Sequence, residues 1–127
     1  MDTATLVEEQ IDAGKRFVAH LEKSGFPVDV ALWALASEDG QWSLYIASPV
    51  VDANGTSAAY ARVFPELSRS QESWITPFDI KLIGSQHPIA AEAAKYRSSV
   101  FSTRVGPNFR GRKLGDLIVE EAYIYPK

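Results

Sequence analysis

Residues 4–24 carry a repeat of three and four positions that predicts an amphipathic helix. The recurring positions on one side are Leu6, Gln10, Ala13, Phe17 and Leu21. Most charged residues of the segment fall on the other side. Gly25 supplies a C-terminal stop and Pro27 prevents the helix from resuming, so the helix should end just before them.

Residues 28–36 and 42–48 alternate in a way that predicts two strands of a hairpin. Asp39-Gly40 lies between them, and this dipeptide adopts the positive φ angles of a tight turn. If these two residues form the turn, Leu35 pairs with Leu44. Both faces of the hairpin are apolar, so we expect cover on both sides. One face carries Trp33, Leu35, Trp42, Leu44 and Ile46, and the other carries Leu32, Ala34, Ala36, Tyr45 and Ala47.

The rest of the chain continues this alternation of helical and extended patterns. It predicts a loop over 49–55, a helix over 56–68, a strand over 78–83, a helix over 88–98, a strand over 99–105, a loop over 106–113 and a strand over 117–125. Pro65 should kink or split the first of these helices, and Ser85 or His87 should cap the second. The order α-β-β-α-β-α-β-β predicts an α+β fold. We expect a five-stranded mixed or mostly antiparallel sheet with about three helices packed on it.

Length and composition place the chain among ordinary globular proteins. With 127 residues, of which 46% are hydrophobic and 23% charged, it fits a single α+β domain over residues 1–127. It has no cysteine, which excludes disulfides and thiolate chemistry. No secretory signal and no apolar run of membrane-spanning length can be read, so we expect a cytoplasmic protein with no membrane partner.

Charge is segregated along the chain, and the basic part suggests a contact surface. Residues 81–113 hold seven basic side chains and one acidic, although the whole chain has a net charge of −3. Arginine pairs well with phosphate or carboxylate, and an aromatic can stack on a base. The alternative is a solvated loop whose charges only maintain solubility. The candidate anion- or partner-binding residues are Arg104, Phe109, Arg110, Arg112 and Lys113.

A second hypothesis rests on Asp79-Ile80-Lys81, which matches the D/E-x-K signature of metal-dependent nucleases. Asp52 would be the upstream acid that shares the metal ion with Asp79, and Lys81 would steady the attacking water. The match is only three residues long, and an exposed strand carries such residues without any catalytic role. A helix also intervenes where that fold has adjacent strands.

Other catalytic chemistry has no support in the sequence. His20 and His87 are the only histidines, and no metal-binding spacing or serine-nucleophile motif includes them. The glycines match no phosphate-binding loop, so we expect no metal and no cofactor. Trp74 and Phe109 stand outside the periodic segments and are candidate surface anchors. Glu120 and Glu121 interrupt the last strand, which suggests either a polar site or an edge strand guarded by charge.

Three segments resemble a group of small uncharacterised bacterial proteins. They are Ser24-Gly25-Phe26-Pro27-Val28, the tryptophan-containing hairpin with Ala31-Leu32-Trp33 and Trp42 to Pro49, and the closing Glu120 to Tyr125. The resemblance implies a bacterial domain and transfers no catalytic residues.

These observations favour a non-enzymatic binding or protein-interaction module that uses the basic loop as its contact surface. We expect a protein partner or a homo-oligomer formed through a sheet edge or apolar face. Nucleic acid is a less favoured partner, because nucleic-acid-binding domains are usually basic overall. The alternatives are a metal-dependent nuclease or phosphodiesterase and a nucleic-acid-binding accessory protein.

Overall fold

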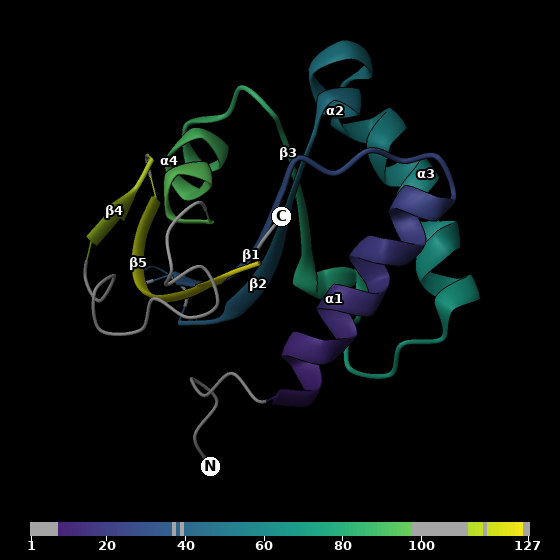
Figure 1. Ribbon diagram of the computed structural model, residues 1–127, viewed down its shortest axis with the longest axis horizontal. Helices are drawn as coiled ribbons and strands as arrows, with labels where there is room; N and C mark the ends of the chain where they lie inside the picture. Colours follow the sequence, from purple (N-terminus) through teal and green to yellow (C-terminus); the bar gives the residue numbers. More distant parts are fainter. Residues whose placement is uncertain (1–7, 37, 39, 98–111, 116, 126–127) are drawn as a thin grey trace.

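A central β-sheet with helices on both faces organises the computed structural model (Figure 1), which describes residues 8–36, 38, 40–97, 112–115 and 117–125. The elements in chain order are α1 (Glu8–Lys23), β1 (Val30–Ala36), β2 (Trp42–Ser48), α2 (Pro49–Asn54), α3 (Thr56–Ser70), the 3₁₀ turn η1 (Pro77–Asp79), β3 (Ile80–Gly84), α4 (Pro88–Arg97), β4 (Arg112–Leu114) and β5 (Leu117–Ile124).

The sheet is mixed, with strand order β3-β2-β1-β5-β4. β1 lies antiparallel to β2 and to β5, and β5 lies antiparallel to β4, whereas β2 and β3 run parallel. A parallel pair needs a long crossover, and here the chain from β2 to β3 contains α2 and α3. The α+β class and the mixed sheet are therefore confirmed.

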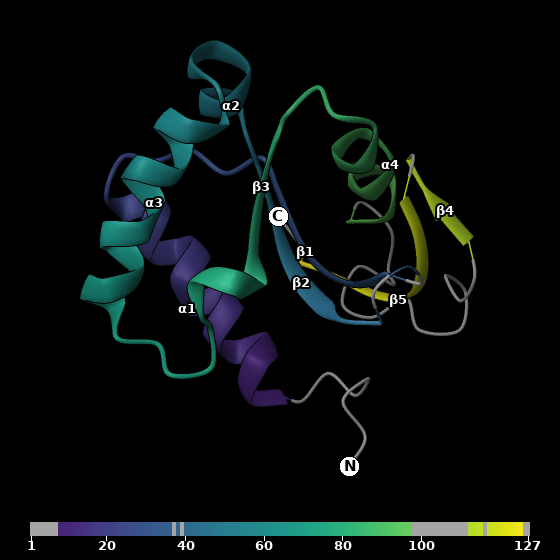
Figure 2. The same ribbon diagram turned by 180° about the vertical axis from the view of Figure 1, so that it is seen from behind.

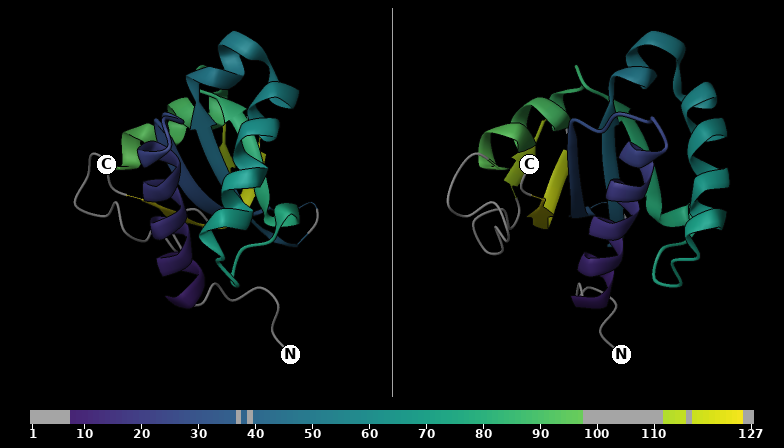
Figure 3. Two further views of the ribbon diagram at one scale, coloured as in Figure 1. Left: turned by 90° about the vertical axis from the view of Figure 1, so that its right-hand side faces the viewer. Right: turned by 45° about the vertical axis from the view of Figure 1, so that its right-hand side comes forward.

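Both faces of the hairpin are covered, as its apolar pattern predicts. One face packs against α1, α2 and α3, and the other packs against α4 (Figure 3). Every residue of β1 and β2 is buried. The first face includes Trp33, Leu35, Trp42, Leu44 and Ile46, and the second includes Leu32, Ala34, Tyr45 and Ala47.

The predicted hairpin register is wrong by two residues. Leu35 pairs with Trp42, and Leu44 pairs with Trp33. The cause is a longer turn, closed where the Ala36 amide bonds to the Gln41 carbonyl. Because side chains alternate with a period of two, a shift of two residues leaves each side chain on its predicted face.

Several predicted elements differ from the structure. The predicted loop over 49–55 contains α2, which Ser48 caps by accepting a 3.1 Å hydrogen bond from the Val50 amide. With α2, the described residues form four α-helices where about three were expected, and the order of elements changes accordingly. Pro65 does not split α3, which runs unbroken through this exposed position.

The strands also need correction. Four of the five predicted strands are present, and the fifth, over 99–105, lies outside the described residues. The fifth strand of the observed sheet is the three-residue strand β4, most of which falls in the predicted loop over 106–113. β3 begins at Ile80, because Pro77 to Asp79 form η1. Of the two predicted caps, Ser85 and His87, it is His87 that caps α4, since its Nδ1 accepts from the Ile89 amide at 3.1 Å.

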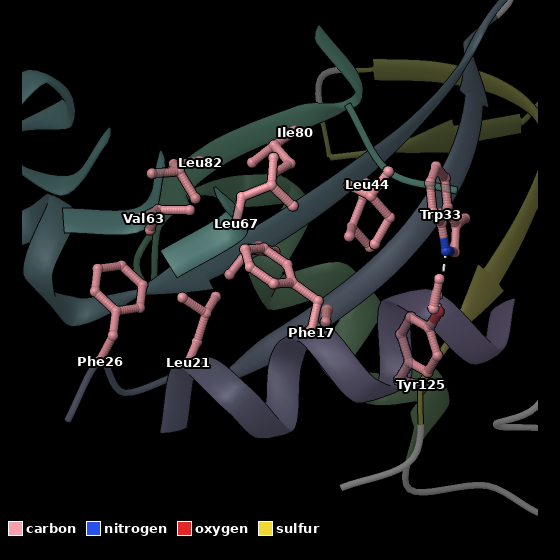
Figure 4. Packing of buried hydrophobic residues seen from close by; sticks show 14 of the residues in the cluster. Phe17, Leu21, Phe26, Trp33, Leu44, Val63, Leu67, Ile80, Leu82 and Tyr125 are labelled. Atoms are coloured by element: carbon pink, nitrogen blue, oxygen red, sulfur yellow. Dashed lines mark hydrogen bonds between the residues drawn. The ribbon is translucent and has the colours of Figure 1, made fainter. Parts of the chain in front are cut away.

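A buried hydrogen-bonded contact fastens α1 to the sheet (Figure 4). Trp33 Nε1 donates to Tyr125 Oη at 3.0 Å, and Tyr125 Oη donates to the Ile11 carbonyl at 2.6 Å. Burial raises the pKa of Tyr125 far above its usual value, so the hydroxyl keeps its proton for this bond. Gly14 faces the pair, and a Cβ there would overlap Tyr125 Oη and lie 2.9 Å from Trp33 Nε1. The helix approaches this closely because residue 14 has no side chain.

Candidate functional site

Only the end of the candidate basic loop belongs to the described residues. Arg112 and Lys113 lie in β4, where they pair with Val119 and Ile118 of β5. The prediction that these two residues form part of a loop is therefore wrong. Arg104, Phe109 and Arg110 lie outside the described residues, as do the side chains of Glu120 and Glu121.

Asp52 follows the start of α2 and binds the chain just beyond β3. Its carboxylate accepts from the Ser85 amide at 2.6 Å and from the Gln86 amide at 3.4 Å. The same carboxylate lies against Gly84, the last residue of β3. Asp52 therefore caps the carboxyl end of this strand.

Asp79 lies at the opposite end of β3. Its carboxylate accepts from the Thr76 amide at 2.9 Å and from Thr76 Oγ1 at 3.2 Å, which closes a capping box around η1. Lys81 Nζ lies 5.8 Å from the centre of the Tyr45 ring. A five-residue strand spans about 16 Å, so Asp52 and Asp79 are too far apart to share one metal ion. Among the described residues, no group of three or more acidic or histidine side chains could hold a metal ion.

Large aromatic side chains are exposed in the segment that joins α3 to β3, residues 71–79, which we term the aromatic connection. Trp74 is 47% exposed and Phe78 is 93% exposed. The sequence marks Trp74 as a candidate anchor because it stands outside the periodic segments. The sequence gives no such signal for Phe78, because this apolar residue extends the strand pattern of residues 80–83 and is therefore read as part of the strand.

Ion pairs join α1 to α3 and to Glu72 in the aromatic connection. Arg16 donates two hydrogen bonds to Glu72, at 2.8 and 2.9 Å. His20 Nε2 lies 2.8 Å from Glu66 Oε1, and Arg69 pairs with the other oxygen of Glu66. The hydrogen bond from Arg16 lowers the pKa of Glu72. The hydrogen bond to His20, with a smaller contribution from Arg69, lowers the pKa of Glu66.

An open pocket of about 250 Å³ lies at one end of these ion pairs, between α3 and the chain that follows α1. Arg62 of α3 forms part of its wall. The Arg62 guanidinium donates to the Gly25 carbonyl at 3.1 Å and lies 5.3 Å from the centre of the Phe26 ring. Phe26 is buried, so its ring is a fixed group, and together the two contacts hold this cation in place.

β3 is an edge strand, and Tyr60 from the crossover bonds to backbone groups on its outer edge. Tyr60 Oη of α3 accepts from the Leu82 amide at 3.0 Å and lies 3.5 Å from the Ile80 carbonyl. An exposed edge with unpaired backbone groups would be a template for strand addition. Tyr60 occupies that position, so self-association through this edge, one of the routes expected from the sequence, would require Tyr60 to move.

Within the described part of the chain, no helix has the length and apolar character needed to cross a membrane. Comparison with protein-family models, with curated proteins and with solved structures gives no significant match.

Proposed function

We propose that this chain is a non-enzymatic protein-interaction module that contacts its partner through the aromatic connection. The exposure of Phe78 and Trp74 within one nine-residue segment carries the proposal. Leaving such large aromatic surface in water forgoes the stabilisation that burial would bring. Tryptophan and other aromatics dominate the binding energy of many protein interfaces, where they fill pockets of the partner.

The aromatic connection is anchored both between its exposed rings and just after them, which supports a binding role. Ile75, between the two aromatics, is 4% exposed and belongs to the core beneath α1 and α3. The Asp79 capping box fixes η1, and Phe78 lies within that turn. A preorganised anchor loses less conformational freedom on binding, so more of its contact energy appears as affinity.

The basic residues Arg104, Arg110, Arg112 and Lys113 remain a second proposed contact surface. We also propose that the protein is bacterial and acts in the cytoplasm. A partner that touches both surfaces would be a protein with apolar pockets and acidic side chains. Replacing Arg110 and Arg112 together by glutamate should leave folding intact and weaken such a partner. A homo-oligomer is the simplest case, and sedimentation velocity of the purified chain measures it.

The decisive experiment compares Trp74→Ser with Phe78→Ser in quantitative affinity capture, followed by titration of the purified partner. Phe64→Ser is the matched control, because Phe64 is 37% exposed but lies on α3 outside the aromatic connection. We expect the anchor variants to lose about tenfold or more in affinity, as interface hot spots do. A purified partner that binds all three variants as tightly as the wild type would refute the proposal.

The metal-dependent phosphodiesterase remains the rival from another class. No observation supports it, because Asp52 and Asp79 lie at opposite ends of β3. Titration with Mg²⁺ by calorimetry distinguishes the two proposals, since the rival requires binding that Asp79→Ala abolishes.

A further inference from the structure

The pocket beside α3 contains the Arg62 guanidinium, which is held in place by uncharged groups. Within the described part of the chain, Arg62 has no carboxylate partner, and its contacts are with the Gly25 carbonyl and the Phe26 ring. A guanidinium has five N–H donors in a rigid fork, and these two contacts leave most of them directed elsewhere. Such a fork matches the paired oxygens of a carboxylate or phosphate.

A second arginine reaches the same pocket from farther along α3. Arg69 follows Arg62 by seven positions, so both lie on one helix face about 10 Å apart along the axis. Arg69 pairs with Glu66, and its side chain is 66% exposed. Glu66 also has His20 on its other oxygen, so it would keep a partner if Arg69 turned towards a ligand. The arginines outnumber the carboxylate, and the pocket is left with net positive charge.

Apolar groups complete the lining, which limits the kind of anion that fits. Phe26, Ala61 and Pro65 line the pocket beside the charged residues, and Ala61 and Pro65 are exposed. A volume of about 250 Å³ is smaller than the usual range for drug-sized ligands. The occupant should therefore be a small oxyanion with at most a short apolar body.

We propose that this pocket is a binding site for a small organic anion, whose carboxylate or phosphate pairs with Arg62 and Arg69 while its apolar part rests on Ala61 and Pro65. The site is separate from the aromatic connection, so the two proposals can fail independently.

The test is a titration followed by ¹H–¹⁵N NMR of the arginine Nε–Hε groups at constant ionic strength. The probes are inorganic phosphate, acetate and benzoate, which share the oxyanion but differ in charge and apolar body. Arg62→Gln and Arg69→Gln remove the proposed contacts one at a time. Arg16→Gln is the control, because Arg16 belongs to the same ion-paired region but does not line the pocket.

We expect saturable shifts at Arg62 and Arg69, and an affinity about tenfold lower in Arg62→Gln, since the variant loses a charge-assisted pair with the oxyanion. Arg16→Gln should bind as the wild type does. Tighter binding of benzoate than of acetate would identify an organic carboxylate, and preference for phosphate would identify a phosphorylated ligand. Shifts that do not saturate, or equal affinity in Arg62→Gln with its backbone spectrum intact, would overturn the proposal.

Discussion

Replacing Gly14 by alanine should destabilise this protein, although the same change stabilises most helices. Alanine in a helix interior is more favourable than glycine by about 1 kcal/mol. At residue 14, however, the new methyl group would overlap Tyr125 Oη and press on Trp33 Nε1. The helix would have to move outward, or the two aromatic side chains would have to leave their rotamers.

The expected magnitude follows from the contacts. Overpacking a core costs about 1–3 kcal/mol. Distorting the Trp33–Tyr125 hydrogen bond adds about 1 kcal/mol, because both groups are buried. After subtracting the helix-propensity gain, the net loss should be about 2 kcal/mol, a large part of the 5–15 kcal/mol typical of a domain.

Urea denaturation measures this loss directly. With an m-value of about 2 kcal/mol per M, the midpoint should fall by about 1 M at an unchanged slope. Ala19→Gly is the reference, because Ala19 is exposed on the same helix and reports propensity alone. Tyr125→Phe removes the overlapping oxygen. In the Tyr125→Phe background, Gly14→Ala should therefore lower the free energy of unfolding by at least about 1 kcal/mol less than it does in the wild type.

Two outcomes would refute the reasoning. Gly14→Ala could be neutral, or it could stabilise the protein by as much as Ala19→Gly destabilises it. Either result would mean that α1 does not approach the sheet so closely. Alternatively, the two substitutions could be additive, which would mean that Tyr125 Oη is not the group that residue 14 meets.

Three further predictions concern stability. Tyr60→Phe should lower stability by about 1 kcal/mol and speed hydrogen exchange at the Leu82 amide, because that amide loses its acceptor; unchanged exchange would argue against the edge contact. The lowered pKa values of Glu66 and Glu72 contribute stability that is present above about pH 4.3 and lost as pH falls through the lower folded pKa values. The urea midpoint of Glu72→Gln should therefore fall less steeply than that of the wild type between pH 5 and 3, and parallel curves would contradict this. Asp79→Ala should cost about 1 kcal/mol through loss of the η1 cap, which thermal unfolding beside an exposed control such as Lys15→Ala measures.

The faces of the elements could be predicted from the sequence, but several connections could not. The period of Ala13, Phe17 and Leu21 identifies the buried side of α1, because burial imposes that period. The strand faces were predicted correctly despite the wrong register. The register itself depends on turn geometry, and Asp39-Gly40 fits more than one turn length.

The proposed sites also differ in how far the sequence reveals them. Trp74 stands out in the sequence because no periodic pattern explains it. The pocket with Arg62 gives no such signal, because its wall combines α3 with residues that follow α1 and is defined only by how the helices pack. For the metal hypothesis, closeness in sequence does not mean a shared element: Asp79 and Lys81 are two residues apart, but Asp79 belongs to η1 and Lys81 to β3.

The parallel pairing of β2 with β3 has a consequence for the order in which the molecule forms. β1 and β2 meet through a short turn, whereas β3 joins them only after more than thirty intervening residues are brought into place (Figure 2). Contacts between distant residues form slowly, because loop closure costs entropy before pairing rewards it. We therefore expect β3 to dock late in folding. The aromatic connection leads directly into β3, so Phe78 would take up its fixed position only then, and a partner that binds it would select fully folded molecules over partly folded ones.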